Sequence, residues 1–97
     1  MARIELAAEV GDDLDRIFDH LTKYEVENIS SRIDEIIEAI SVLERNPLIG
    51  RPAHGDKREL VIGRRTRGYV ALYRHVTEID TVFVLALRGH REAGYER

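Results

Sequence analysis

The spacing of the apolar residues changes near residue 57, and this change constrains the fold more than any other feature of the 97-residue chain. From residue 8 to residue 43, apolar residues recur at steps of three and four, which is typical of one buried face on an α-helix. They form two stripes, the first of Val10, Leu14, Ile17, Phe18, Leu21 and Tyr24, and the second of Val26, Ile29, Ile33, Ile36, Ile37, Ile40 and Leu43. After residue 57 the apolar residues alternate or run together, as they do in β-strands. The pattern therefore predicts two helices followed by strands.

The segments between these patterns set the boundaries of the expected elements. The short break at Tyr24–Glu25 predicts that the two helices form an antiparallel hairpin. Asn46 and Pro47 predict the end of the second helix, since asparagine tolerates the left-handed conformation and proline cannot continue the helical hydrogen bonds. Two prolines and two glycines between Asn46 and Lys57 predict a long loop.

Four segments have the patterns of strands. Polar and apolar residues alternate over residues 3–7 and 68–76, whereas residues 59–62 form a short, β-branched run. Residues 81–87 are almost wholly apolar, which predicts a central strand covered on both faces. We expect an α+β fold of order β-α-α-β-β-β, in which an antiparallel helical hairpin packs on one face of a mainly antiparallel sheet. At this length, residues 1–97 are expected to form a single domain.

Composition excludes several classes of protein. The chain contains no cysteine, so a disulfide framework and a zinc ribbon are ruled out, as suits a cytoplasmic protein. The first residues lack the apolar run of a signal peptide, and no stretch is apolar enough to span a membrane. We therefore expect a small, soluble, cytoplasmic protein without a membrane partner.

Charge divides the chain into an acidic and a basic half. Residues 1–49 hold 5 Lys and Arg against 12 Asp and Glu, whereas residues 50–97 hold 10 against 6. The acidic residues at 9–19 are explained by the helix dipole, which favours carboxylates in the first turns, and by a solvated helix face. The helical hairpin is thus predicted to be acidic, and the sheet and the tail of the chain to be basic.

Several kinds of catalytic or ligand site are disfavoured. Gly50–Gly55 has the glycine spacing of a phosphate-binding loop, but Pro52 removes a backbone donor and Asp56 would repel phosphate. The four histidines lie at least 15 residues apart, which gives no local metal-binding spacing. Neither a cysteine nor a serine elbow supplies a nucleophile. We expect no metal and no cofactor.

A group of basic and aromatic residues in the second half is the strongest candidate for a site. It consists of Arg64, Arg65, Arg67, Arg74, Arg88, His90, Arg91 and Tyr95. In one interpretation the arginines stabilise a phosphodiester transition state, while His90 or Tyr95 supplies acid–base chemistry or stacks on a base. In the other, Tyr95 fastens the tail to the core and the arginines form a solvated sheet edge. The residue types alone favour the second interpretation and leave the first open.

Several segments resemble the RelE/ParE superfamily of toxins from bacterial type II toxin–antitoxin modules. They are Arg58–Ile62, Gly68–Arg74, Val82–Arg88 and His90–Tyr95, and Asn46–Arg51 is similar to the loop that follows the second helix in that superfamily. The resemblance covers nearly the whole chain. It implies a helical hairpin on a small, curved, mainly antiparallel sheet, which agrees with the fold expected from the apolar spacing.

Members of the superfamily act in two ways. RelE-like members cleave messenger RNA on the ribosome with basic residues and a C-terminal tyrosine, whereas ParE-like members poison DNA gyrase and serve in plasmid stabilisation. Arg88 and Tyr95 match the RelE-like arginine and tyrosine, but Lys57 is the only counterpart of the RelE-like lysines. The ending Arg91–Tyr95 is more similar to the ParE-like branch, although Gly89-His90 stands where that branch commonly has His-Gln. A net charge of -3 also disfavours RNA binding.

The resemblance therefore predicts a toxin that inhibits DNA gyrase by direct binding and is neutralised by a cognate ParD-like antitoxin, whose flexible C-terminal segment folds onto it. Operator DNA is expected to be contacted only through the antitoxin. The predicted surface for the antitoxin or the target consists of Arg65, Arg67, Arg74, Arg88, Arg91 and Tyr95. One alternative is an inactive relic that only binds antitoxin. The other is an mRNA endoribonuclease whose site near the scissile phosphate consists of Arg88, His90, Arg91 and Tyr95.

Overall fold

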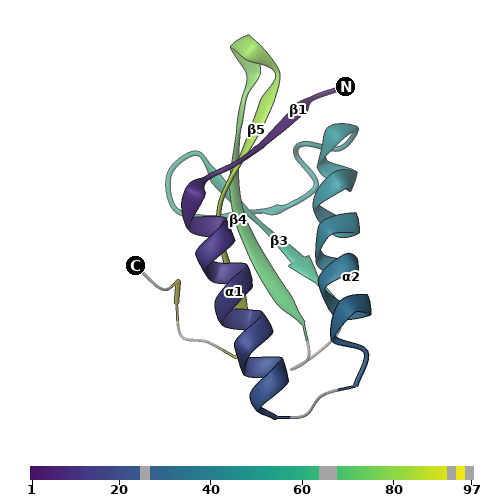
Figure 1. The fold of residues 1–97 in the computed structure, drawn as a ribbon. Coiled ribbons are helices and arrows are strands. Elements are labelled where there is room, and N and C mark those ends of the chain that lie inside the picture. The colour runs from purple at the N-terminus through teal and green to yellow at the C-terminus, as the bar shows by residue number, and fades with distance from the viewer. Residues whose placement is uncertain (25–26, 64–67, 92–93, 96–97) are drawn as a thin grey trace.

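Two helices and a five-stranded sheet make up the part of the chain that the computed structural model describes, namely residues 1–24, 27–63, 68–91 and 94–95. Figure 1 shows the helices running antiparallel to each other across the sheet. The helices are α1 (Ala8–Lys23) and α2 (Ile29–Ser41), and short 3-10 turns follow at Val42–Glu44 and Thr77–Ile79. The strands are β1 (Arg3–Leu6), β2 (Arg51–Pro52), β3 (Lys57–Ile62), β4 (Tyr69–Val76) and β5 (Thr81–Gly89).

The strands follow the order β1-β5-β4-β3-β2 across the sheet. β1 pairs with β5 in parallel, and each of the other neighbouring pairs is antiparallel. Parallel strands need a long connection, and the helical hairpin and three further strands lie between β1 and β5 in the chain. The predicted α+β class, with a helical hairpin and a mainly antiparallel sheet, is confirmed.

The apolar stripes of both helices pack on one face of the sheet and form the core. Val10, Ile17 and Leu21 of α1 share one buried cluster with Ile36 and Ile40 of α2. Burial of such stripes, worth about 25 cal/mol per Å² of apolar surface, stabilises helices that would be marginal in isolation. The strands contribute to the same cluster the side chains of Ile62, Ala71, Tyr73, Val82, Val84 and Leu87.

Some boundaries differ from those expected from the sequence. α2 begins at Ile29, and Val26, which was expected in this helix, lies outside the described residues. The prediction that Asn46–Lys57 is a loop throughout is wrong, because this segment contains the short strand β2. Arg58 holds the segment against β3, since its guanidinium donates a hydrogen bond to the carbonyl of Gly50 at 2.9 Å. This side-chain contact has no periodic signature in the sequence.

A β-bulge interrupts the pairing of β4 with β5. Leu72 faces Ala86, yet Tyr73 faces Val84, so Leu85 is an extra residue in β5. Successive side chains of a strand point to opposite faces of the sheet, so one inserted residue reverses the direction of every side chain that follows it. The bulge therefore decides which residues at the end of β5 point towards the helices.

We call the face of the sheet that the helices do not cover the outer face. Beyond the bulge Leu87 belongs to the core, so its neighbour Arg88 lies on the outer face, in a row with Val70 and Val61. Without the extra residue, Leu87 and Arg88 would exchange faces. Cross-strand pairing places on the same outer face Lys57, Glu59, Leu72, Arg74, Phe83 and Ala86.

Asp13 contradicts the prediction that the acidic residues at 9–19 are solvated. Its side chain is 3% exposed, and its Oδ2 accepts the backbone N–H of Leu87 at 2.9 Å. Arg16 donates a hydrogen bond to the Leu87 carbonyl at 3.1 Å. β1 pairs with β5 only as far as Val84. Beyond that residue, side chains of α1 form the hydrogen bonds with β5 that the backbone of a longer β1 would form. The prediction fails for Asp13 because this residue faces the edge of a strand and not water.

Candidate functional site

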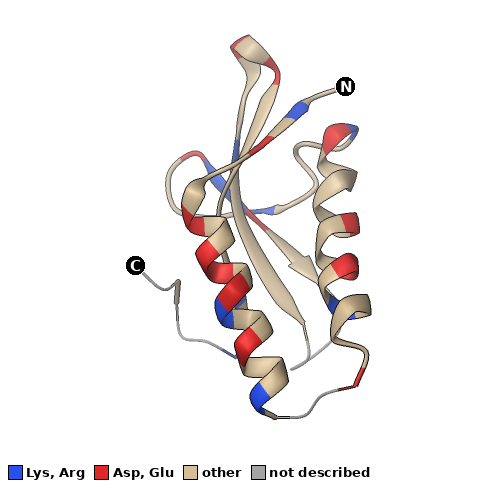
Figure 2. Ribbon diagram, viewed as in Figure 1, with Lys and Arg blue, Asp and Glu red and all other residues tan. Residues whose placement is uncertain are grey.

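Basic residues from four strands gather on the outer face. Arg51 comes from β2, Lys57 from β3, Arg74 from β4 and Arg88 from β5. In Figure 2 the acidic residues instead mark the turns of α1 and α2. The predicted division into an acidic helical hairpin and a basic sheet therefore corresponds to two surfaces of the folded chain.

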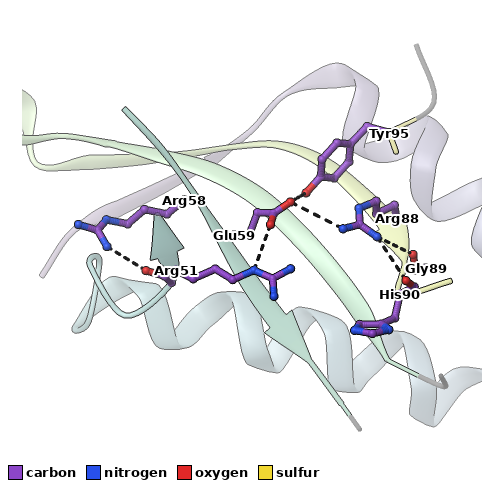
Figure 3. Close-up of polar contacts among 8 residues, drawn as sticks. Arg51, Arg58, Glu59, Arg88, Gly89, His90 and Tyr95 are labelled. Carbon is purple, nitrogen blue, oxygen red and sulfur yellow. Dashed lines mark hydrogen bonds and ion pairs between the residues drawn. The ribbon is translucent and has the colours of Figure 1, made fainter. Parts of the chain in front are cut away.

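Glu59 of β3 connects three polar groups on the outer face (Figure 3). Its Oε1 accepts a hydrogen bond from Arg51 Nε at 3.1 Å, and its Oε2 accepts one from the Tyr95 hydroxyl at 2.7 Å. Arg88 Nη2 lies 3.8 Å from the same Oε2. The side chains of Glu59 and Arg88 are 17% and 14% exposed, so their contact is largely shielded from water. We call Arg51, Glu59, Arg88 and Tyr95 the Glu59 cluster.

The contacts within the Glu59 cluster determine the charge of its members. The hydrogen bond from Tyr95 lowers the pKa of Glu59; burial opposes this effect, and Arg51 and Arg88 assist it. Burial, followed by the hydrogen bond to the Glu59 carboxylate, raises the pKa of Tyr95 far above its usual value. At neutral pH Glu59 is therefore ionised, and Tyr95 is a neutral phenol that donates a hydrogen bond to the Glu59 carboxylate.

Arg88 ties the end of β5 to the tail of the chain. Its guanidinium lies over the Tyr95 ring, with 5.3 Å from Cζ to the ring centroid. Its Nη1 donates to the carbonyls of Gly89 and His90 at 3.3 and 3.4 Å (Figure 3). The backbone N–H of His90 donates in turn to the Gly68 carbonyl at 2.9 Å, which extends the pairing of β4 with β5. Tyr95 is thus held against the sheet by Arg88 and Glu59.

The structure brings two of the predicted site residues together and places a third nearby. Arg88 and Tyr95 are in contact within the Glu59 cluster. Arg74 lies on the same outer face but pairs with Asp56, with Nε 3.3 Å from Oδ2 and both side chains well exposed. Such an exposed pair leaves the Arg74 guanidinium accessible to a partner.

Four predicted site residues remain, of which the structure describes two. His90 and Arg91 are exposed after the end of β5, where His90 contributes its backbone groups to the contacts of Arg88 and Gly68. Arg65 and Arg67 lie outside the described residues.

Glu59 and Arg51 were absent from the predicted site, although Glu59 is the centre of the cluster. One signal for Glu59 is present in the sequence, since it is the only acidic residue between Lys57 and Val76, a segment with several basic ones. Its proximity to Arg88, by contrast, depends on the order of three strands in the sheet. Sequence patterns alone do not provide that order.

Gly50 positions Arg51 beside Glu59. The backbone N–H of Gly50 donates to the buried hydroxyl of Tyr73 at 2.8 Å. A Cβ at Gly50 would lie 2.7 Å from the Tyr73 ring and hydroxyl, and 2.9 Å from the Glu59 carbonyl oxygen. This glycine, part of the spacing that resembles a phosphate-binding loop, is therefore required for close packing of the segment against the sheet.

An apolar groove lies on the helical side of the molecule. It has a volume of about 230 Å³ and runs between β1, α1 and α2, with Leu6, Leu14 and Ile37 among its lining residues. Leu6 and Ile37 are more than half exposed. Exposed apolar surface of this kind is typical of sites that contact other proteins. The helical side thus offers an apolar surface among acidic residues.

Two kinds of feature were not found in the described ranges. Within residues 1–24, 27–63, 68–91 and 94–95, no group of three or more His, Asp or Glu side chains could hold a metal ion. No helix in the same ranges is both long enough and apolar enough to cross a membrane.

The family model for the ParE toxin of the type II toxin–antitoxin system parDE matches residues 4–94. Among solved structures, the chain is similar to one described as the chromosomal ParDE TA system from P. aeruginosa, with a TM-score of 0.75 and 22% sequence identity. That match covers 92% of this chain and 96% of the other, and at this identity it shows a shared fold. None of the curated proteins matches significantly.

Proposed function

This chain belongs to the ParE toxin family of type II toxin–antitoxin systems, and on that premise we propose that it inhibits DNA gyrase by direct binding. A cognate ParD-like antitoxin neutralises the toxin in the cytoplasm, and the pair contacts operator DNA only through the antitoxin. The module serves in plasmid stabilisation, and the toxin needs no catalytic step and no cofactor.

The arrangement around Glu59 is the observation that most supports binding over RNA cleavage. A site that cleaves RNA must present cations to a phosphate, whereas Arg51 and Arg88 already face the Glu59 carboxylate at 3.1 and 3.8 Å. The Glu59 carboxylate offsets part of the positive charge that these two arginines could offer to a phosphate. The cluster is therefore better suited to contact a protein than to hold a scissile phosphate.

The state of Tyr95 supports the same proposal. Its hydroxyl donates to Glu59 at 2.7 Å, so its proton is directed at a carboxylate of the same chain. Its raised pKa makes the phenol a weaker acid than a free tyrosine, and proton transfer is most effective when the pKa lies near the working pH. The hydrogen bond and the raised pKa of Tyr95 thus favour a role in anchoring the tail over a role in acid–base catalysis.

We place the contacts with gyrase and with the antitoxin on the outer face and the tail. Complementary charge speeds the encounter with an acidic partner segment, and a flexible antitoxin segment can fold on this surface as it binds. Because both partners use one surface, bound antitoxin excludes gyrase. The described residues that we assign to this surface are Arg74, Arg88, Arg91 and Tyr95. We propose that Arg65 and Arg67, which lie outside the described residues, also contact a partner.

Two parallel reactions test this proposal. Purified toxin is added to a gyrase supercoiling reaction and to translating ribosomes that carry labelled message. We expect loss of supercoiling with intact message, and recovery of supercoiling when the antitoxin is added. Unaffected supercoiling together with discrete cleavage of the message would contradict the proposal and identify an mRNA endoribonuclease. If neither reaction is affected, the chain is a relic that only binds antitoxin.

The Tyr95→Phe variant sharpens this test, because it removes the hydroxyl and keeps the ring next to Arg88. In a gyrase inhibitor, it should inhibit supercoiling at nearly the wild-type concentration. In an endoribonuclease, it should lower cleavage with little change in affinity for the antitoxin. Tyr24→Phe, at an exposed tyrosine of the helical hairpin, is the matched control.

A further inference from the structure

We propose that Asp13 and Arg16 of α1 are positioning residues for Arg88, which they keep on the outer face by bracing the bulged end of β5. The inference rests on the proposed function, because it concerns the surface to which gyrase is proposed to bind. It assigns a role in shaping that surface to two residues of α1, which lies on the opposite, acidic side of the molecule.

The direction of the Arg88 side chain depends on the bulge. The register of β5 against β4 shifts by one residue at Leu85. With an uninterrupted register, Arg88 would point towards the helices and could not approach Glu59 on the outer face. The contact of Arg88 with Glu59 therefore requires the extra residue to stay in place.

Asp13 and Arg16, which we call the brace, hold Leu87, the residue directly before Arg88. A bulge disturbs the local ladder, and the backbone groups of β5 at this point also lie beyond the end of β1. Asp13 Oδ2 accepts the N–H of Leu87 at 2.9 Å, and Arg16 Nη2 donates to the carbonyl of Leu87 at 3.1 Å. Both polar groups of one backbone unit are thus satisfied by one turn of α1.

The two side chains also orient each other. Arg16 Nη2 lies 3.7 Å from Asp13 Oδ1, with the two side chains 29% and 3% exposed. The hydrogen bonds of both side chains to Leu87 have an ionised partner, which makes them stronger than hydrogen bonds between neutral groups. The carboxylate and the guanidinium therefore form a rigid support for Leu87.

A role limited to the stability of α1 would leave these contacts unexplained. A carboxylate that only favours the helix dipole interacts near the start of its own helix, whereas Asp13 bonds to a residue 74 positions away in the sequence. Arg16 reaches the same residue from 71 positions away. The convergence of both side chains on Leu87 links α1 to Arg88, and through Arg88 to the cluster.

Loss of the brace should release the end of β5 and move Arg88 away from its two neighbours. Two observables report this movement without requiring gyrase. The first is the contact between the Arg88 side chain and the Tyr95 ring. The second is the pKa of Glu59, which is lowered by its contacts with Tyr95, Arg51 and Arg88.

The experiment uses the full chain and nuclear magnetic resonance. Asp13→Asn keeps the shape of the side chain but removes its charge, and Arg16→Lys keeps the charge but loses the planar guanidinium. Asp15→Asn, at an exposed position of the same helix, is the matched control. In both brace variants we expect loss of the nuclear Overhauser contact between Arg88 and the Tyr95 ring at pH 7. The Glu59 carboxyl carbon should titrate closer to its ordinary pKa of 4.5.

The proposal is overturned if the brace variants fold and keep both the ring contact and the wild-type Glu59 titration. If Asp13→Asn does not fold, Arg16→Lys decides the question, because that residue is less buried. The gyrase reaction separates this inference from the proposed function. If the wild type does not inhibit gyrase but the brace variants lose the ring contact, only the proposed function is refuted. If the wild type inhibits gyrase but the brace variants keep the Glu59 cluster undisturbed, only the brace is refuted.

Discussion

The helical layer and the outer face of the sheet carry opposite charges, and they hold these charges in different ways. On α1 most carboxylates project into water, as the exposed Asp12, Asp15 and Asp19 do. On the outer face, Glu59 and Arg88 are largely shielded and are linked through Tyr95. Exposed charges contribute little to stability, whereas shielded, hydrogen-bonded charges fix geometry. The outer face is therefore the more ordered of the two charged surfaces.

Asp13 shows why some charged side chains are solvated and others are held by hydrogen bonds. In sequence it belongs to the acidic half, yet in the structure its carboxylate is shielded from water and hydrogen-bonded, as that of Glu59 is. It lies where β1 has ended and the edge of β5 still needs hydrogen-bond partners. For Asp13, its position beside a strand edge decides that the side chain is held and not solvated.

Gly50→Ala should have the largest effect on stability and should disrupt the outer face. The new Cβ would meet Tyr73 at 2.7 Å and the Glu59 carbonyl at 2.9 Å, so β2 must move and carry Arg51 away from Glu59. Overpacking of this kind costs about 1–3 kcal/mol of the free energy of unfolding, or more. Urea denaturation measures the loss.

Gly11→Ala is the matched control for Gly50→Ala on the helical layer. A Cβ at Gly11 meets none of the described atoms within 4 Å. Alanine within a helix is more favourable than glycine by about 1 kcal/mol, so this variant should be stabilised. Equal effects at the two glycines would show that the outer face is no more tightly packed than the helical surface.

Glu59→Gln should have the next largest effect, about 1–2 kcal/mol of the free energy of unfolding at pH 7, because contacts to a charged group are weakened. The pKa of Glu59 is lowered from 4.5 in the folded chain, so the stabilisation is complete above pH 4.5 and is lost as the pH falls through the folded pKa. The gap in stability between wild type and variant should therefore stay constant near neutral pH and close in acid. Unfolding at a series of pH values measures this gap, and a gap that persists in acid would contradict the assigned charge state.

Tyr95→Phe should have a smaller effect, about 1 kcal/mol, since it removes one hydrogen bond from a partly exposed side chain. The pKa of Glu59 should rise in this variant, because the bond from Tyr95 is the main cause of its lowering. Carboxyl titration by nuclear magnetic resonance gives this value, with Tyr24→Phe as the exposed control. An unchanged titration would mean that Tyr95 does not act on Glu59 in solution.

Arg74→Ala should change stability least. The pair of Arg74 with Asp56 is exposed on both sides, and such pairs contribute about 0.5 kcal/mol or less. Thermal unfolding of this variant should therefore resemble that of the wild type. A large loss would show that Arg74 belongs to the structural network around Glu59, and would disqualify it as a probe of binding.

The elements could be predicted from sequence because their signals are local. The stripe of α1 indicated correctly that Val10, Ile17 and Leu21 reach the core, whereas Phe18 and Tyr24 of the same stripe are at least half exposed. Ile37, at the margin of the second stripe, was expected in the core but lines the open groove instead. How far each stripe is covered depends on the width of the sheet beneath it, which no local pattern reports.

The Glu59 cluster could be predicted only in part, because its members come from four separate segments. Arg88 and Tyr95 were identified by residue type, whereas Arg51 and Glu59 join them only through the strand order. The direction of Arg88 depends further on the bulge at Leu85, which leaves no signal in an almost wholly apolar strand. The contacts that organise this surface are therefore non-local.

We propose that partners bind the outer face and not the helical layer. The most direct test is the toxin concentration that halves gyrase supercoiling, measured for Arg74→Glu on the outer face and Asp15→Lys on α1, both exposed charge reversals. We predict that Arg74→Glu needs about tenfold more toxin, which corresponds to about 1.4 kcal/mol of binding, and that Asp15→Lys matches the wild type. An unchanged Arg74→Glu beside a weakened Asp15→Lys would contradict the claim and move the binding surface to the helices.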